Sequence, residues 1–166
     1  MHKPDKLRRH PLAEYWRLSF SFPEQTLSHS ITDNIRYAYL VAKFLLKFRF
    51  EKRQKNKFQS DIRPGRKQKE VVFRSYMLKT TLYWFMCNRN SHRSCVANEL
   101  FFLLQHLLGF YVKRHLPHFF LPEVNLLEQT EEGEIDAVVK EVRLMLSDLE
   151  GCVINTLKAV RVVDYR

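Results

Sequence analysis

Glycine is scarce in this chain, with only 4 among 166 residues. β-Sandwiches and barrels need glycine at many tight turns, so the shortage argues against these folds. Hydrophobic residues make up 45% of the sequence, which is typical of long helices. We therefore expect a mainly α fold, a multi-helix bundle around one core, since about 100 to 200 residues usually build a single domain.

Cysteine is also rare and shows no pairing pattern. Cys87, Cys95 and Cys152 form neither an even set nor a CxxC motif, which argues against a secreted disulfide framework. The charged segment His2–Pro11 lacks the apolar core of a signal peptide, and apolar runs such as Phe101–Leu104 are too short to span a bilayer. We expect a soluble protein of a reducing compartment, cytoplasmic with the nucleus as the alternative, and no membrane partner.

One group of metal-ligand residue types occurs along the chain. Cys87, His92 and Cys95 lie within nine residues of each other. Structural zinc is usually held by four ligands, and no fourth lies nearby. Cys87 also falls at the end of an apolar helical face, where a free cysteine commonly packs as a small hydrophobe. We predict no metal site here.

Catalytic motifs are missing too. The sequence contains no GxGxxG or GxxxxGKS/T phosphate loop, no HExxH and no nucleophile elbow. Two-metal phosphoryl transfer needs carboxylates paired to hold divalent ions, whereas the carboxylates here gather mostly in Glu128–Glu134. We interpret that run as a solvated loop. We predict no catalytic residue and no cofactor, and do not expect the chain to be an enzyme by itself.

Charge is abundant but unevenly placed. The net charge is +10, and residues 41–80 hold 13 Lys/Arg against 3 Asp/Glu, whereas residues 123–166 hold 5 against 10. Such a basic excess attracts phosphates of a nucleotide, a nucleic acid or a membrane surface, although a solubilising surface is an equal alternative. The candidate contacts to a nucleic-acid backbone are Arg53, Lys55, Lys57, Arg66 and Lys67.

Apolar residues at three-to-four spacing predict a long helix that follows the cap candidates Thr32 and Asp33. Its apolar positions are Ile35, Ala38, Leu40, Val41, Phe44, Leu45 and Phe48. The same spacing predicts a helix over Tyr76–Met86 capped by Ser75, and a central helix over Val96–Tyr111 that is apolar nearly all round. A final helix or helix pair is expected over 135–160, with a break at Gly151.

Three segments are predicted to be non-helical. Alternating apolar and small polar residues in Tyr15–Pro23 indicate an extended segment. The polar, basic stretch Glu51–Lys69 contains Pro64 and reads as an exposed loop. Two prolines in Leu116–Pro122 disfavour helical geometry before them, so we expect this apolar segment to be extended and packed.

Basic and aromatic residues are interleaved on two of the predicted helices. Lys43 and Lys47 lie on the first, and Arg74, Ser75, Tyr76 and Lys79 lie at the start of the second. Helix N-terminal amides, a hydroxyl, a ring and ammonium groups could together hold a phosphate and stack a base. On composition alone, a core-edge tyrosine and ordinary surface lysines are the favoured alternative.

Three strings then occur in one order: WRLSFS at Trp16–Ser21, SYMLKT at Ser75–Thr80, and LPHFFLPEVNLL at Leu116–Leu127. They resemble the C-terminal helical half of the Mab-21-like family, which includes cyclic GMP-AMP synthase and related innate-immune receptors. The resemblance spans about Tyr15 to Leu127, and the third string is the most specific. It implies a basic tail at 1–14, the helical domain at 15–127 and a helical extension of it at 128–166.

The resemblance also implies functional residues. Tyr76 would stack on a nucleobase, Ser75 would help position a nucleotide, and Lys43 would contact its phosphate. Full-length members carry a second, catalytic lobe with a Gly-Ser loop and metal-binding carboxylates, and no such loop precedes Trp16. Mg²⁺ or Mn²⁺ is expected only with that lobe.

A further departure from the family pattern concerns the nucleic acid that activates vertebrate cyclic GMP-AMP synthase. Vertebrate cyclic GMP-AMP synthase carries a zinc-binding insertion of one histidine and three cysteines, whereas the corresponding stretch Phe22–Asn34 has His29 and no cysteine. DNA sensing through such a zinc site is therefore not expected. The partners that the resemblance favours are ATP or GTP, double-stranded RNA, or, for a non-catalytic member, another protein.

Overall fold

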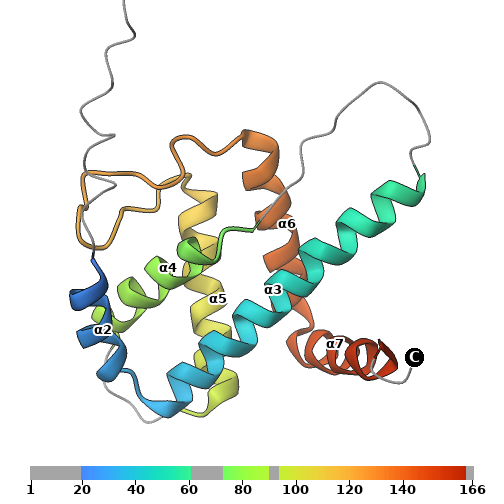
Figure 1. The fold of residues 1–166 in the computed structure, drawn as a ribbon, viewed down its shortest axis with the longest axis horizontal. Helices are drawn as coiled ribbons and strands as arrows, with labels where there is room; N and C mark the ends of the chain where they lie inside the picture. The colour runs from blue at the N-terminus through green and yellow to red at the C-terminus, as the bar shows by residue number, and fades with distance from the viewer. Residues whose placement is uncertain (1–19, 61–72, 90–93, 164–166) are drawn as a thin grey trace, which may run out of the picture. The chain divides into compact units, whose positions relative to one another are not determined.

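The computed structural model of this protein describes residues 20–60, 73–89 and 94–163, with only the backbone for 51–60 and 160–163. Its helices are α2 (Ser21–His29), α3 (Asp33–Ser60), α4 (Ser75–Cys87), α5 (Val96–Val112), α6 (Glu132–Ser147) and α7 (Leu149–Val163) (Figure 1). In these described ranges the β-structure is limited to one isolated bridge, between Pro117 and Asn125. The mainly α prediction is confirmed. The chain divides into two compact units, residues 1–31 and 32–166.

The first unit contributes α2, where an extended segment was expected. Residues 15–19 of the predicted extended segment lie outside the described residues, and Ser21–Pro23 form the first turn of α2 instead. Proline is tolerated there because the first amides of a helix have no intrahelical acceptor. The Glu24 amide donates to the Phe20 carbonyl oxygen at 2.9 Å and starts the hydrogen-bond ladder.

In the second unit, α3 begins as predicted and continues further than predicted. Its helical backbone runs to Ser60, so the prediction of a loop is wrong for residues 51–60, and 61–69 lie outside the described residues. Lysine, arginine, glutamine and glutamate are good helix formers, and residues 51–60 contain neither proline nor glycine. The basic segment therefore starts on a helix.

The buried face of α3 differs in part from the predicted stripe. Leu40 and Phe44 are 51% and 42% exposed, whereas Ala42 and Leu46 are fully buried. A helix of mixed apolar residues has more than one face that fits the three-to-four spacing, and the neighbouring helices select which one is buried. The buried positions are Ile35, Ala38, Ala42, Leu45, Leu46 and Phe50.

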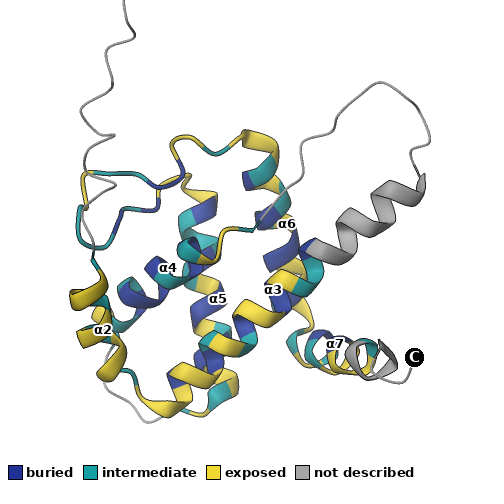
Figure 2. Ribbon diagram, viewed as in Figure 1, coloured by how far each residue is buried: buried dark blue, intermediate teal, exposed yellow. Residues whose placement is uncertain are grey.

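The helix α5 packs against α3, α4 and α6 (Figure 1), which confirms the predicted central position of this helix. Its core residues are Leu100, Leu103, Leu104, Leu107 and Tyr111. Figure 2 shows buried positions on α3, α4, α5 and α6 of this bundle. No helix among residues 20–60, 73–89 and 94–163 is long and apolar enough to cross a membrane.

The last two helices separate at Asp148 and not at the predicted Gly151. Asp148 has φ −150° and ψ 71°, and its carboxylate oxygen Oδ1 accepts the Gly151 amide at 2.9 Å. This is the geometry of an N-cap. A Cβ at position 151 would lie 2.1 Å from the Asp148 carboxylate, so the absence of a side chain at Gly151 lets the carboxylate approach the first turn of α7.

The predicted acidic loop is also shorter than expected. Glu132 and Glu134 form part of the first turn of α6. Acidic side chains at this position interact favourably with the positive end of the helix dipole, which explains why the acidic run starts a helix.

Candidate functional site

The start of α4 combines a hydroxyl, an aromatic ring and backbone amides. Ser75 is the first residue of the helix and is exposed, Tyr76 is half-buried, and Arg74 is the N-cap with an extended backbone. The prediction that Ser75 caps the helix is wrong, because it lies one position later and no side-chain cap bond forms. The first turn closes when the Met77 amide donates to the Arg74 carbonyl oxygen at 2.9 Å. The amides before it are of the kind that bind anions at helix N-termini.

Tyr76 is held by a residue that the sequence reasoning did not identify. Its hydroxyl oxygen lies 2.7 Å from Nε2 of His118, and the two rings are 5.8 Å apart between centroids with a tilt of 37°. His118 is 4% exposed. The signal was present in the motif LPHFFLP, whose single histidine lies in an otherwise apolar segment.

The segment that carries His118 is non-helical, as predicted, but only 116–118 are extended, whereas 119–122 form bends and the start of a turn. Leu116 is fully buried, the Leu126 amide donates to the Leu116 carbonyl oxygen at 2.8 Å, and the His118 amide donates to the Val124 carbonyl oxygen at 2.8 Å. These bonds close 116–126 into a narrow loop. His118 is therefore presented by a backbone that is tied at both sides.

Asn125 ties the base of this loop to the end of α5. Its Oδ1 accepts the amides of Leu116 and Leu127 at 2.9 and 3.1 Å, and its Nδ2 donates to the Arg114 carbonyl oxygen at 3.1 Å. Arg114 has a φ of 52°, the left-handed conformation that commonly ends helices. The side chain of Asn125 thus forms hydrogen bonds with three backbone groups.

Aromatic residues of α4 anchor the first half of the same loop. The Trp84 indole Nε1 donates to the Pro117 carbonyl oxygen at 2.8 Å. The ring of Phe119 lies 5.2 Å from the rings of Trp84 and Tyr83. Because α4 carries both these anchors and Tyr76, the distance between Tyr76 and His118 is set by rigid elements.

Lys43 lies in the middle of α3 and is exposed. Seven residues later on the same helix, Phe50 is buried and its ring stacks on Phe73 at 5.8 Å with an interplanar angle of 16°. Residues seven apart share a helical face and are separated by about 10 Å along the axis. Lys43 therefore lies about 10 Å from the Phe50–Phe73 contact along the axis of α3, and the described residues show no direct contact between Lys43 and Ser75 or Tyr76.

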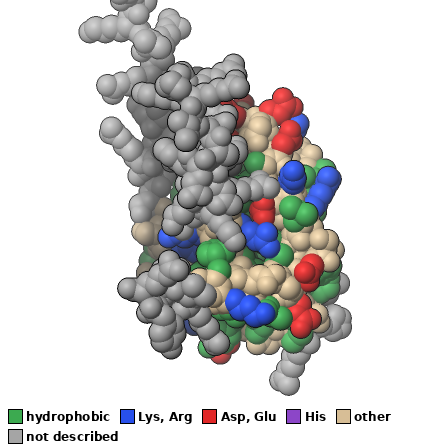
Figure 3. Space-filling view, turned by 90° about the vertical axis from the view of Figure 1, so that its right-hand side faces the viewer, with side chains coloured by type: hydrophobic (Ala, Val, Ile, Leu, Met, Phe, Trp, Pro, Cys, Tyr) green, Lys and Arg blue, Asp and Glu red, His purple; other side chains and the backbone are tan. Residues whose placement is uncertain are grey.

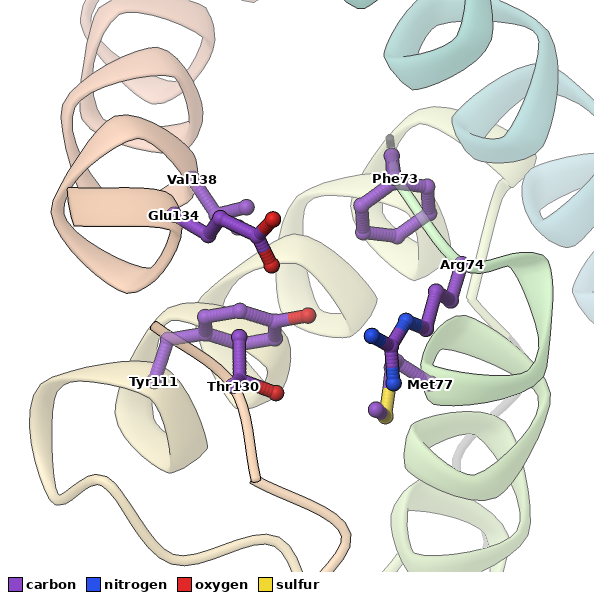
Figure 4. A pocket seen from close by; sticks show the side chains of 7 residues that line it. All are labelled: Phe73, Arg74, Met77, Tyr111, Thr130, Glu134 and Val138. Atoms are coloured by element: carbon purple, nitrogen blue, oxygen red, sulfur yellow. The ribbon is translucent and has the colours of Figure 1, made fainter. Parts of the chain in front are cut away.

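A small cavity lies between the start of α4, the end of α5 and the start of α6 (Figure 4). Its volume is about 10 Å³, which is room for about one water molecule and far too little for a nucleotide. Arg74 and Glu134 approach it from opposite sides, and Tyr111 lies between them (Figure 4). Burial raises the pKa of Tyr111, an effect that the nearby Arg74 partly opposes, so this phenol stays neutral.

A comparison with protein families decides the assignment. The family model described as the Mab-21 protein HhH/H2TH-like domain matches residues 47–144, which is more than half of the chain. The chain belongs to the Mab-21 family. No curated protein matches it.

The matched part of the Mab-21 domain contains most of the candidate site. It begins within α3, ends within α6 and includes Ser75, Tyr76 and His118, whereas Lys43 lies four residues before it. The family assignment therefore covers the loop that holds His118 and the helix that carries Tyr76.

The remaining predicted site residues of this Mab-21 domain are those for nucleic-acid contact, and the structure does not describe their side chains. Arg53, Lys55 and Lys57 lie on the described backbone of α3, and their side chains are not described. Arg66 and Lys67 fall outside the described residues. Within residues 20–60, 73–89 and 94–163, no three His, Cys, Asp or Glu side chains come together as a metal site.

One face of the Mab-21 domain can be followed in Figure 3. Basic and acidic side chains are interspersed over the described part of this face, with apolar side chains between them. Interspersed charges of both signs create a weak long-range field. The described part of this face therefore shows no single-sign patch for a phosphate backbone.

Proposed function

We propose that this Mab-21 domain binds a nucleotide at the start of α4. The observation that carries the proposal is the Tyr76–His118 hydrogen bond of 2.7 Å, which holds an aromatic ring beside the first amides of a helix. Tyr76 would contact the base, and Ser75 with those amides would face phosphate. Lys43 on α3 would supply positive charge.

The chemistry of these residues suits a nucleotide with base and phosphate engaged together. Stacking of a base on an aromatic side chain contributes about 1–3 kcal/mol, and a helix N-terminus favours anions. The described residues include no cluster of three or more His, Cys, Asp or Glu side chains that could hold a metal ion. Mg²⁺ or Mn²⁺ would act only with a catalytic lobe of the family type.

Calorimetric titration of the whole chain with ATP and GTP tests the proposal. We expect millimolar or tighter affinity, lost at least tenfold in the double variant Tyr76→Ala, Lys43→Ala, because it removes the stacking ring and a phosphate charge. A matched control is Tyr37→Ala, Lys140→Ala, which removes an exposed tyrosine and an exposed lysine elsewhere. The control should bind as the wild type does.

Two results would contradict this assignment. Equal loss in both double variants would place the nucleotide away from α4. Absence of nucleotide binding by a folded chain would favour the alternative function, a non-catalytic protein-interaction module, for which the exposed side chains of Tyr37 and Leu40 on α3 offer apolar surface.

A second candidate function is binding of double-stranded RNA. The observation that favours it is that α3 continues to Ser60, because a helical backbone orders the basic residues of its second half. Affinity should fall steeply with salt and show little sequence preference. Replacing the predicted contacts with glutamate should abolish binding; these are Arg53, Lys55, Lys57, Arg66 and Lys67.

A control for RNA replaces three exposed basic residues of α6 and α7 with glutamate, namely Lys140, Arg143 and Lys158, and is compared with the triple replacement of Arg53, Lys55 and Lys57. Filter binding or fluorescence anisotropy at two salt concentrations would measure both variants. Unchanged affinity in the variant with the α3 residues replaced would exclude the α3 segment as the RNA surface.

The proposed location of the protein is the cytoplasm, because all three cysteines are free thiols, as expected in a reducing compartment.

A further inference from the structure

The hydrogen bonds around His118 define which of its ring nitrogens carries the proton. Its Nδ1 lies 3.2 Å from the amide nitrogens of both Phe120 and Leu121. A backbone amide can only donate, so Nδ1 must accept and carries no hydrogen. A neutral imidazole with an unprotonated Nδ1 has its hydrogen on Nε2.

The direction of the bond to Tyr76 follows from this tautomer. Nε2 lies 2.7 Å from the Tyr76 hydroxyl oxygen, so Nε2–H donates and the hydroxyl oxygen accepts. The hydroxyl hydrogen of Tyr76 is therefore turned away from His118. Both the tilt of the ring and the direction of its O–H group are set by a side chain that is 4% exposed.

We propose that His118 is a positioning residue for nucleotide binding, acting through Tyr76. This role rests on the function proposed above. The tied loop, anchored by Asn125 at its base and by Trp84 at Pro117, holds the imidazole, and the imidazole holds the tyrosine ring in its binding orientation before a ligand arrives. A ring that is ordered in advance loses less conformational freedom on binding, which raises affinity.

The tautomer gives a test that does not depend on any ligand. Long-range ¹H–¹⁵N correlation spectra of the uniformly labelled chain separate protonated from unprotonated ring nitrogens. We expect His118 to show a protonated Nε2 and an unprotonated Nδ1. A protonated Nδ1 would overturn the inference, because the hydroxyl of Tyr76 would then be the donor and its direction would be reversed.

A substitution separates the two roles of the imidazole. In His118→Asn, the amide oxygen can still accept the amides two and three residues later, as in an Asx turn, but the side chain is too short to reach Tyr76. We expect a folded variant whose affinity for ATP is lower by about three- to tenfold, the factor for one hydrogen bond.

A double-mutant cycle with Tyr76→Phe shows whether His118 acts through the hydroxyl. In the Tyr76→Phe background, His118→Asn should change ATP affinity by less than about twofold, since the bond it removes is already absent. Fully additive losses in a chain that binds ATP would overturn the role of His118 alone. Absence of ATP binding by the wild-type chain would overturn the proposed function and this role together, while the tautomer would still report on the Tyr76–His118 bond.

Discussion

Replacing Arg89 with alanine should lower the free energy of unfolding by about 3–5 kcal/mol, the largest effect we expect from one substitution. The guanidinium of Arg89 pairs with the carboxylate of Glu99 near the start of α5. The side chain of Glu99 is 1% exposed and that of Arg89 20%. Removal of Arg89 leaves a buried carboxylate without its countercharge, and desolvation of an unpaired charge is costly.

Urea denaturation followed by circular dichroism would measure this loss. The matched control is Arg36→Ala, which breaks an ion pair with Asp33 whose two side chains are 52% and 81% exposed. Exposed pairs contribute little, so the control should stay within about 0.5 kcal/mol of the wild type. A loss below about 1 kcal/mol in Arg89→Ala would contradict the burial of Glu99.

The double variant Arg89→Met, Glu99→Leu tests whether the loss of stability in Arg89→Ala comes from the unpaired charge or from lost packing. Replacement of a whole buried ion pair by apolar residues is often neutral, so it should recover most of the stability lost in Arg89→Ala. Recovery would attribute the loss to the unpaired charge and not to the shape of the side chains. An equally unstable double variant would argue for packing instead.

Asn125→Ala should cost about 3 kcal/mol, since its side chain makes three hydrogen bonds to backbone groups and each contributes about 1 kcal/mol. The bonds are those to the amides of Leu116 and Leu127 and to the Arg114 carbonyl oxygen. The same change should loosen the loop that carries His118. Thermal or chemical unfolding measures the stability, and ATP titration measures the consequence for Tyr76.

Asn125→Asp is the matched control for this loop. It keeps an oxygen that accepts the two amides and loses the donor to Arg114, so it should cost less than Asn125→Ala. Equal losses in both variants would show that the two amide bonds do not hold the loop. A stable Asn125→Ala variant with unchanged ATP affinity would show that the loop does not depend on this side chain.

Much of the architecture could be predicted from local patterns. The spacing of apolar residues placed α3, α4 and α5 at nearly their observed starts, and the two prolines in Leu116–Pro122 correctly indicated a non-helical segment. Boundaries were less accurate where two local signals compete. Pro23 reads as the end of an extended segment but lies in the first turn of α2, and Gly151 reads as a break although Asp148 ends α6 and caps α7.

The candidate site was predicted only in part. Ser75, Tyr76 and Lys43 could be proposed from residue types and from the resemblance to the Mab-21 family, and their roles in binding stay predictions. The sequence did not single out His118 or Asn125. His118 contacts a residue that lies far away in the sequence, and the hydrogen bonds of Asn125 depend on the conformation of the loop. Tyr76 and His118 are 42 residues apart along the chain, a separation that no periodic pattern can bridge.

By itself the sequence determined the helical class, the order of the main helices and, through three short strings, the Mab-21 resemblance that the family match confirms. Those properties depend on residue spacing and on local backbone preferences, which act over a few residues. Tertiary packing alone decided which face of α3 is buried, so that Ala42 is inside and Leu40 outside. It also decided that a buried histidine meets Tyr76, because the loop after α5 reaches α4 only when α4 packs against α5.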